Sequence, residues 1–232
     1  MYNDLPTLTT ADGQQTTGFP ILIRNSPTGP KTAVLRLPTS AELLDWFAQQ
    51  KDVIKTLGRG QTEEVAALTP KADQRLFRTI RIDRLAGADT GDGAGMGVEF
   101  DDDEALYALG QITRHRVESC ERDGQTFVVV LTTTWTDRLT HTIRIPYESE
   151  ISKYRRAAVT VRSLPNGYIE QRLNVGAAVE LYDSILVGAD GYGAWSVVGS
   201  VAGSVPPHHK RTVIVKLLTE LSLLDPALDP NS

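Results

Sequence analysis

Residues 114–146, which decide the fold, read RHRVESCERDGQTFVVVLTTTWTDRLTHTIRIP. The Asp-Gly pair at 123–124 is a strong signal for a tight hairpin, and β-branched residues alternate with other residues on both sides of it. A second turn is expected at 136–138, which completes an antiparallel three-stranded meander. Because every second side chain of a strand shares a face, His141 is expected on the same core face as its apolar neighbours in 139–145.

Helical patterns surround this β region. Thr39 is followed three residues later by Glu42, which predicts a capping box at the start of a helix that ends at Gly58. Two short strands before it, Phe19–Arg24 and Thr32–Leu37, are expected to pair as a hairpin. Further helices are predicted over 70–83, 100–113, 147–158, 174–188 and 205–224.

The remaining segments predict an arm and two loops. Residues 1–17 are rich in Thr, Gln, Asp and Gly and show no helical or strand period, which predicts a flexible N-terminal arm. Glycine-rich segments at 86–99 and 188–204 predict two long loops, where partners would be met. The expected fold is therefore α+β, with the meander and several amphipathic helices forming a single body over 18–232.

The composition narrows the functional classes. The chain has 232 residues with 24 Lys and Arg against 29 Asp and Glu, a formal net charge of -5 that argues against a chain-wide nucleic-acid surface. Cys120 is the single cysteine, so neither an intrachain disulfide nor a thiolate metal cluster is expected. No apolar run is long enough for a membrane span and no signal-peptide pattern opens the sequence, so we expect a cytoplasmic protein without a membrane partner.

The common catalytic and cofactor motifs do not fit this sequence. The glycine run in 86–99 lacks the lysine of a phosphate-binding loop and the third glycine of a dinucleotide-binding loop. Its tripeptide 89–91, Asp-Thr-Gly, occurs in aspartic proteases but follows no apolar strand here, and the acidic residues of 89–103 lack the EF-hand spacing. No catalytic, cofactor-binding or metal-binding residue is therefore predicted, and His141 is expected to be a hydrogen-bonded core histidine rather than a base with an Asp or Glu partner.

The other histidines are the next candidates for a site. His208 and His209 are adjacent at the start of the last helix, where their side chains leave the axis about 100° apart, which disfavours a shared metal ion. This polar helix start is expected to face water, and the sequence leaves open whether the two histidines bind anything. His115 and Cys120 are five residues apart on one predicted strand, which places them on opposite faces.

Five basic residues are candidate contacts for a partner or an anion. Lys210 and Arg211 at the start of the last helix suit a phosphate or a carboxylate that also meets the backbone N–H groups there. Lys153, Arg155 and Arg156 are close in sequence to Tyr154 and could follow a nucleic-acid backbone, although a solvated helix face is the commoner explanation.

Several features together resemble virion structural or tail-assembly proteins of tailed bacteriophages. They are the Thr-, Gln- and Gly-rich leader, the helix start LPTSAELLDWF at 37–47, the acidic charge, the single cysteine and the two glycine-rich loops. The resemblance implies a non-enzymatic homo-oligomer, or a partner of other assembly proteins, that is made in the cytoplasm and incorporated into a virion. The alternative that stays open is a nucleic-acid-binding module centred on Arg155 and Arg156.

Overall fold

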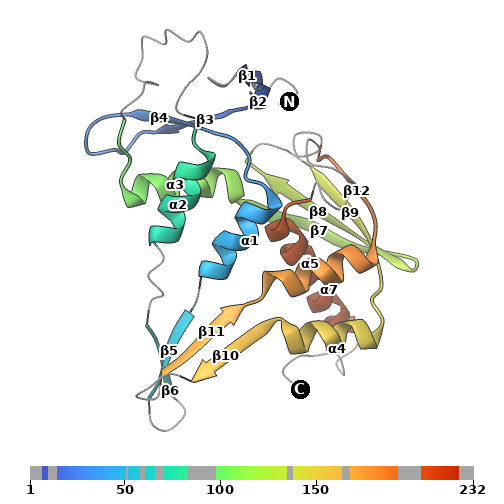
Figure 1. Ribbon diagram of the computed structural model, residues 1–232. Coiled ribbons are helices and arrows are strands. Elements are labelled where there is room, and N and C mark those ends of the chain that lie inside the picture. Colours follow the sequence, from blue (N-terminus) through green and yellow to red (C-terminus); the bar gives the residue numbers. More distant parts are fainter. Residues whose placement is uncertain are drawn as a thin grey trace.

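The computed structural model describes residues 7–9, 15–50, 52–57, 61–65, 70–82, 98–134, 138–163, 168–192 and 205–224. Over these residues the fold is α+β, with helices packed on antiparallel sheets (Figure 1). The helices are α1 (Ser40–Gln49), α2 (Pro70–Ile80), α3 (Asp102–Thr113), α4 (Glu148–Ala157), α5 (Val175–Ile185) and α7 (Pro207–Leu224). The strands are β1 (Thr7–Thr9), β2 (Gln15–Thr17), β3 (Phe19–Ile23), β4 (Lys31–Leu35), β5 (Asp52–Leu57), β6 (Gln61–Val65), β7 (His115–Asp123), β8 (Thr126–Thr133), β9 (Leu139–Arg144), β10 (Val159–Ser163), β11 (Tyr168–Leu173) and β12 (Leu186–Asp190).

The main sheet has the strand order β12-β9-β8-β7, with every neighbouring pair antiparallel. The turn between β7 and β8 contains Gly124 at a φ of 60°, a conformation that glycine adopts without steric cost. The sheet has four strands, because β12 pairs with β9 beside the three strands that the sequence predicts. Most of the second predicted turn, 136–138, lies outside the described residues.

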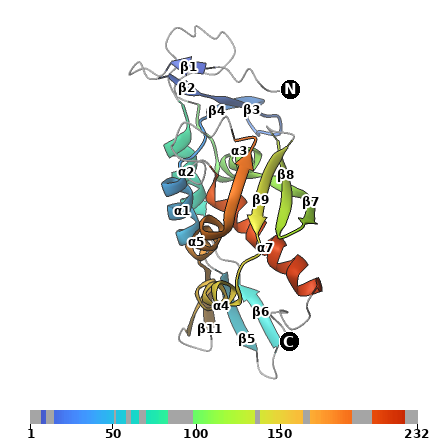
Figure 2. The same cartoon turned by 90° about the vertical axis from the view of Figure 1, so that its right-hand side faces the viewer.

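Helices α5 and α7 pack on one face of the main sheet (Figure 2). On β9 the buried positions alternate with the polar Thr140, Thr142 and Arg144, as the period of two requires, whereas on β8 Val130 is buried as well as Val129 and Leu131. The buried side chains of this core are Phe127, Val129, Leu131, Leu139, Ile143, Ala178, Leu181, Tyr182, Ile185, Tyr192, Val205, Val213, Ile214, Leu217 and Leu221. This core therefore packs strands from the middle of the chain, β8 and β9, against the last helix, α7.

A second core lies between the β3–β4 hairpin and helices α1, α2 and α3. Both capping boxes in it are formed: Thr39 with Glu42 at the start of α1, and Asp101 with Glu104 at the start of α3. Glu104 is buried, and both its carboxylate oxygens lie 2.9 Å from Nζ of Lys31 on β4. The acidic start of α3 thus caps its helix, as the macrodipole favours, and also joins it to the hairpin.

The remaining four-stranded sheet has the order β10-β11-β5-β6 and lies at the opposite end of the molecule from β3 and β4 (Figure 1). None of its four strands was predicted from the sequence, β6 included. Helix α1 ends at Gln49 rather than at Gly58, and 52–57 is the strand β5; β10 and β11 were not predicted. The β-branched residues of 52–57 suit a strand, and pairing with β6 and β11 outweighs the local helical pattern.

Two further segments differ from the predictions. Helix α5 begins at its Asn174 cap as predicted but ends at Ile185, and 186–190 forms β12, so the loop expected from 188 begins later. Within the predicted arm, β1 and β2 pair as a two-stranded sheet. The other parts of the arm and most of both glycine-rich loops lie outside the described residues. No helix among the described residues is long and apolar enough to cross a membrane.

Candidate functional site

Three histidines from two distant segments of the chain meet inside the body. His115 is the first residue of β7, and His208 and His209 lie in the first turn of α7. One ring nitrogen of each lies within 4.8 Å of the others. The ring centroids are 4.3 Å apart for His208 and His209, 4.7 Å for His115 and His209, and 5.2 Å for His115 and His208. We call these three residues the histidine cluster.

The expectation that the polar start of the last helix faces water was wrong. Every residue from Val205 to Lys210 is buried, because this turn lies over the sheet next to α5 rather than at the surface. The adjacent rings of His208 and His209 also come together, although their Cα–Cβ directions diverge. Rotation about the two side-chain torsions of each residue brings both rings toward His115.

Hydrogen bonds orient the His115 ring. Its Nδ1 lies 3.0 Å from the carbonyl oxygen of Thr113, and its Nε2 lies 2.6 Å from Oγ1 of Thr212 on α7. Because a carbonyl oxygen only accepts, Nδ1 carries the hydrogen, and Nε2 accepts from the Thr212 hydroxyl. The Nε2 lone pair of His115 is therefore on the side of α7.

A chain of side-chain hydrogen bonds connects His209 to the core of the sheet. Nδ1 of His209 lies 2.9 Å from the hydroxyl of Tyr192, which lies 3.0 Å from Nε2 of His141. Nδ1 of His141 lies 2.7 Å from the hydroxyl of Tyr182 on α5. His141 is fully buried, which confirms the prediction of a hydrogen-bonded core histidine. Its partners are tyrosine hydroxyls, so this geometry does not support a His141 base with an Asp or Glu partner.

Burial keeps all four histidine rings neutral near pH 7. It lowers the pKa of His141 and of His208 to about 3, and it holds the pKa of His209 well below its ordinary value. The pKa of the half-buried His115 is also lowered, mainly by desolvation. A neutral imidazole keeps one lone pair, so the cluster is in the protonation state that binds metal ions.

Cys120 lies on the same face of β7 as His115, contrary to the expectation. The register of β7 against β8 shifts between Val117 and Ser119, and this bulge reverses the alternation that follows it. Burial raises the pKa of the Cys120 thiol to about 11, with a further contribution from Glu220 on α7. Glu220 is three turns of α7 beyond the histidines, so Cys120 belongs to another part of the core.

The two basic residues at the start of α7 are in different environments. Lys210 is only 5% exposed, and its Nζ lies 2.6 Å from Oδ1 of Asp183 on α5. Its charge is thus already neutralised inside the protein. Arg211 is half-buried, and its charge reaches both Tyr154 and His115: burial raises the pKa of Tyr154 and Arg211 partly opposes this, whereas burial lowers the pKa of His115 and Arg211 adds to it.

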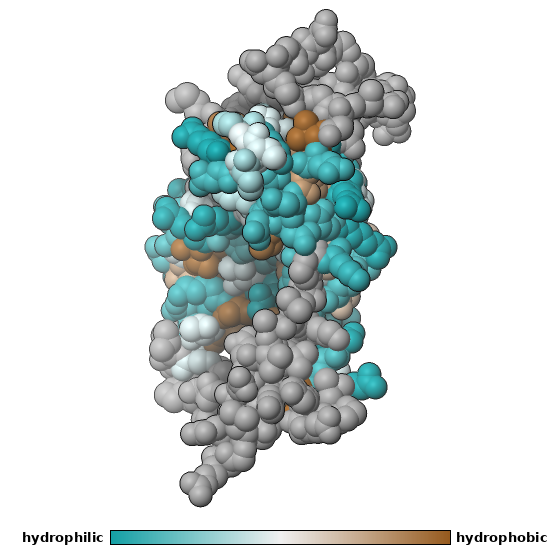
Figure 3. Space-filling view, turned by 90° about the vertical axis from the view of Figure 1, so that its left-hand side faces the viewer, coloured by the Kyte–Doolittle hydropathy of each residue, from teal (hydrophilic) through white to brown (hydrophobic). Residues whose placement is uncertain are grey.

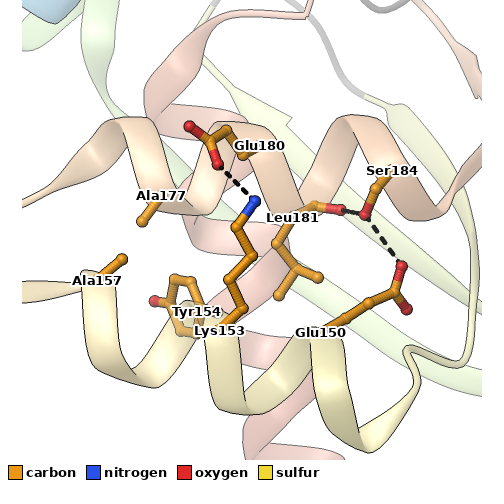
Figure 4. A pocket seen from close by; sticks show the side chains of 8 residues that line it. All are labelled: Glu150, Lys153, Tyr154, Ala157, Ala177, Glu180, Leu181 and Ser184. Atoms are coloured by element: carbon orange, nitrogen blue, oxygen red, sulfur yellow. Dashed lines mark hydrogen bonds and ion pairs between the residues drawn. The ribbon is translucent and has the colours of Figure 1, made fainter.

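Of the basic residues of α4, Lys153 lines a pocket of about 150 Å³ between α4 and α5 (Figure 4). Nζ of Lys153 lies 3.2 Å from Oε2 of Glu180 across this pocket, and Glu150 contributes a second carboxylate to its lining. Arg155 and Arg156 are exposed on α4. Since the described structure buries Lys210 and places Lys153 among acids, it does not gather the five candidate residues on one basic surface.

The second candidate site was not predicted from the sequence. It is the outer edge of the four-stranded sheet β10-β11-β5-β6, which we call the projecting sheet. Strand β10 is at the end of the order β10-β11-β5-β6, and all five of its residues are exposed. Val159 and Val161 are 42% and 57% exposed, and Leu173, opposite Val159 on β11, is 46% exposed. The alternation of valines in VTVRS was the available signal, but the preceding helix pattern obscured it.

The face of the molecule in Figure 3 is mainly hydrophilic, with isolated apolar spots between its grey ends. Two sites thus stand out in the described residues: a buried histidine cluster and an exposed apolar strand edge. No family model, curated protein or solved structure matches this chain.

Proposed function

We propose that this chain is a structural or assembly protein that acts through protein–protein contacts, with strand β10 pairing to β10 of a second copy. The observation that carries the proposal is the outer edge of β10, with which no other described strand pairs. A strand edge presents N–H and C=O groups that accept another strand, and proteins that stay apart block such edges with bulges or charges. β10 has no register shift against β11 and contains a single charged residue, Arg162.

The edges of the main sheet are different. β7 has a bulge between Val117 and Ser119 and five exposed residues with charged side chains, and β12 has a register shift between Leu186 and Gly188. Both devices discourage pairing with another chain. The edge of β10 therefore lacks the bulge and the charges that guard the two edges of the main sheet.

Antiparallel pairing of two β10 strands has two symmetric registers that oppose no like charges. If Val161 faces Val161 of the second copy, Thr160 faces Arg162; if Thr160 faces Thr160, Val159 faces Val161. A register centred on Arg162 would instead place two arginines together. Both favourable registers are symmetric about a two-fold axis, which is the commonest symmetry of homo-oligomers. Both also join the exposed valines of the two copies into one apolar row.

The resemblance to virion and tail-assembly proteins of tailed bacteriophages supports the same class of function. In that setting a projecting sheet joins copies of the subunit, and the protein passes from the cytoplasm of the producing cell into a virion. Basic residues of α4 are then part of the solvated surface rather than a nucleic-acid site.

The test is the molar mass of wild type and Val161→Lys, measured by size-exclusion chromatography with light scattering and absorbance at two ultraviolet wavelengths. We expect a discrete wild-type oligomer free of nucleic acid, and a monomeric Val161→Lys, because lysine on an edge opposes strand pairing. Val187→Lys is the matched control, since Val187 is 63% exposed on the bulged edge strand β12. A monomeric wild type, or an excess of nucleic-acid absorbance that salt removes, would contradict the proposal.

A further inference from the structure

The histidine cluster is built from the ligand type that transition metals prefer among nitrogen donors. Imidazole suits Zn²⁺, Cu²⁺ and Ni²⁺, whereas Ca²⁺ and Mg²⁺ prefer oxygen ligands. Three histidines with one further position for water or an anion form a known type of zinc coordination sphere. The cluster lies in the body and not on β10, so an inference about it is independent of the proposed assembly function.

We propose that His115, His208 and His209 bind one divalent transition-metal ion, with Zn²⁺ as the ion that fits a tetrahedral site with three nitrogen ligands. The distances agree with this. In such a site two ligand nitrogens lie about 3.3 Å apart, as Zn–N bonds of about 2.0–2.1 Å require. The three ring nitrogens lie within 4.8 Å of one another. Moving each by about 1 Å toward the centre therefore completes the coordination.

The hydrogen bonds around two of the rings already have the arrangement of metal ligands. A metal-bound histidine usually donates its other N–H to a carbonyl, carboxylate or water, which fixes the ring and its tautomer. His115 donates Nδ1–H to the carbonyl oxygen of Thr113, which leaves Nε2 for the metal. The metal replaces the hydroxyl of Thr212 as the partner of that nitrogen.

For His209 the tautomer follows from the chain that ends at Tyr182. If His209 donates Nδ1–H to the hydroxyl oxygen of Tyr192, that hydroxyl donates to Nε2 of His141, and Nδ1–H of His141 is donated to Tyr182. Every hydrogen bond of the chain is satisfied in this direction. Nε2 of His209 then carries the lone pair. Metal binding selects this direction over the reverse, in which Nε2 carries a hydrogen.

The position of the site defines its role and its access. It joins the start of β7 to the first turn of α7, and its ligands His115 and His208 are 93 positions apart in the sequence. A bound ion therefore holds the last helix on the sheet. The side of His115 and Thr212 is half-buried and gives an ion its entry, whereas His208 and His209 are buried. Because the three ligands are neutral, the fourth ligand is best an anion or hydroxide that reduces the buried charge.

The experiment uses the full chain, stripped with EDTA and dialysed into metal-free buffer. Calorimetry with Zn²⁺ is expected to give one ion per chain, and Co²⁺ is expected to give the visible absorption of tetrahedral coordination. Zn²⁺ is also expected to raise the melting temperature. His208→Ala and His115→Gln are each expected to weaken Zn²⁺ binding at least about 100-fold, since even removal of an outer hydrogen-bond partner costs 10–100-fold.

His141→Gln is the control for histidine content. It removes the fourth histidine of the chain but no ligand and reaches His209 only through the Tyr192 hydroxyl, so it is expected to keep one Zn²⁺ per chain with a clearly smaller loss of affinity than either ligand variant. If His208→Ala does not fold, His115→Gln at the half-buried side of the cluster carries the test. A wild type that gives no tetrahedral Co²⁺ spectrum, or ligand variants that bind Zn²⁺ as the wild type does, would overturn the proposal.

Discussion

Acidification from pH 7.5 to pH 5 is expected to lower the free energy of unfolding of the metal-free protein by about 4 kcal/mol. The pKa of His141 and of His208 is about 3 in the folded protein, against an ordinary value of 6.5. The unfolded chain therefore binds more protons than the folded one between these values. Stability that is present above pH 6.5 is lost as the pH falls toward 3, and each of the two histidines contributes about 2 kcal/mol of the loss at pH 5.

The titratable groups around these histidines do not change the direction in which the free energy of unfolding depends on pH. His141 contacts the hydroxyls of Tyr182 and Tyr192, whose pKa values burial raises, so both stay neutral. His115 and His209 have lowered pKa values and act in the same direction. Carboxylates with lowered pKa values lose their contributions only below about pH 4.5. The interval between pH 6.5 and 4.5 thus reports mainly on the histidines.

Urea unfolding followed by circular dichroism in EDTA, at several pH values from 7.5 to 5, measures this loss. The control is His141→Phe, which is expected to be less stable at pH 7.5 because two buried tyrosine hydroxyls lose their partner. Its further loss on acidification should be smaller than that of the wild type by about 2 kcal/mol. Equal losses in the two proteins would show that His141 does not titrate on unfolding.

The parts of the fold that local patterns specify were predictable from sequence. The capping box at Thr39 and the hairpin at Gly124 involve residues only a few positions apart, and the structure forms both as predicted. The capping box of Asp101 with Glu104 has the same short spacing but was not predicted. Residues 52–57 and 186–188 were placed in helices, and 189–190 in a loop. Their strands exist because β11 and β9 lie beside them, and pairing across more than a hundred and more than forty residues leaves no local signal.

The histidine cluster could not be predicted from spacing. Its ligands are separated by most of the C-terminal half of the chain, and adjacent histidines are not a recognised metal pair. The burial of His208 and His209 depends on α7 packing its first turn against the sheet. The bulge after Val117 similarly placed Cys120 on the face opposite to the expected one. Only His141, on a regular strand with apolar neighbours two residues away, was correctly assigned from its pattern.

Gly191→Ala is expected to lower the free energy of unfolding by about 3 kcal/mol, as steric strain and a shift of the backbone together require. Gly191 has a φ of 91°, which side chains of L-residues rarely adopt. A Cβ there would lie 2.4 Å from the carbonyl oxygen of Arg138 and 3.3 Å from Cα of Leu139. Because both contacts are with the backbone at the start of β9, the strand or the turn must move.

Gly124→Ala is the matched control, because Gly124 also has a positive φ, 60°, but nothing lies within 4 Å of a Cβ built there. Gly124→Ala should lower the free energy of unfolding by only about 1 kcal/mol, which is the cost of placing an L-residue at a positive φ. Urea unfolding of both variants at pH 7.5 separates the close contact from the conformational cost.

Gly191 also precedes Tyr192, whose hydroxyl joins His141 to His209, so displacement of this turn should weaken Zn²⁺ binding by about 10-fold or more. Equal destabilisation by the two substitutions would mean that the approach of Gly191 to Arg138 does not hold the turn in place, and Tyr192 would then be positioned by its hydrogen bonds alone.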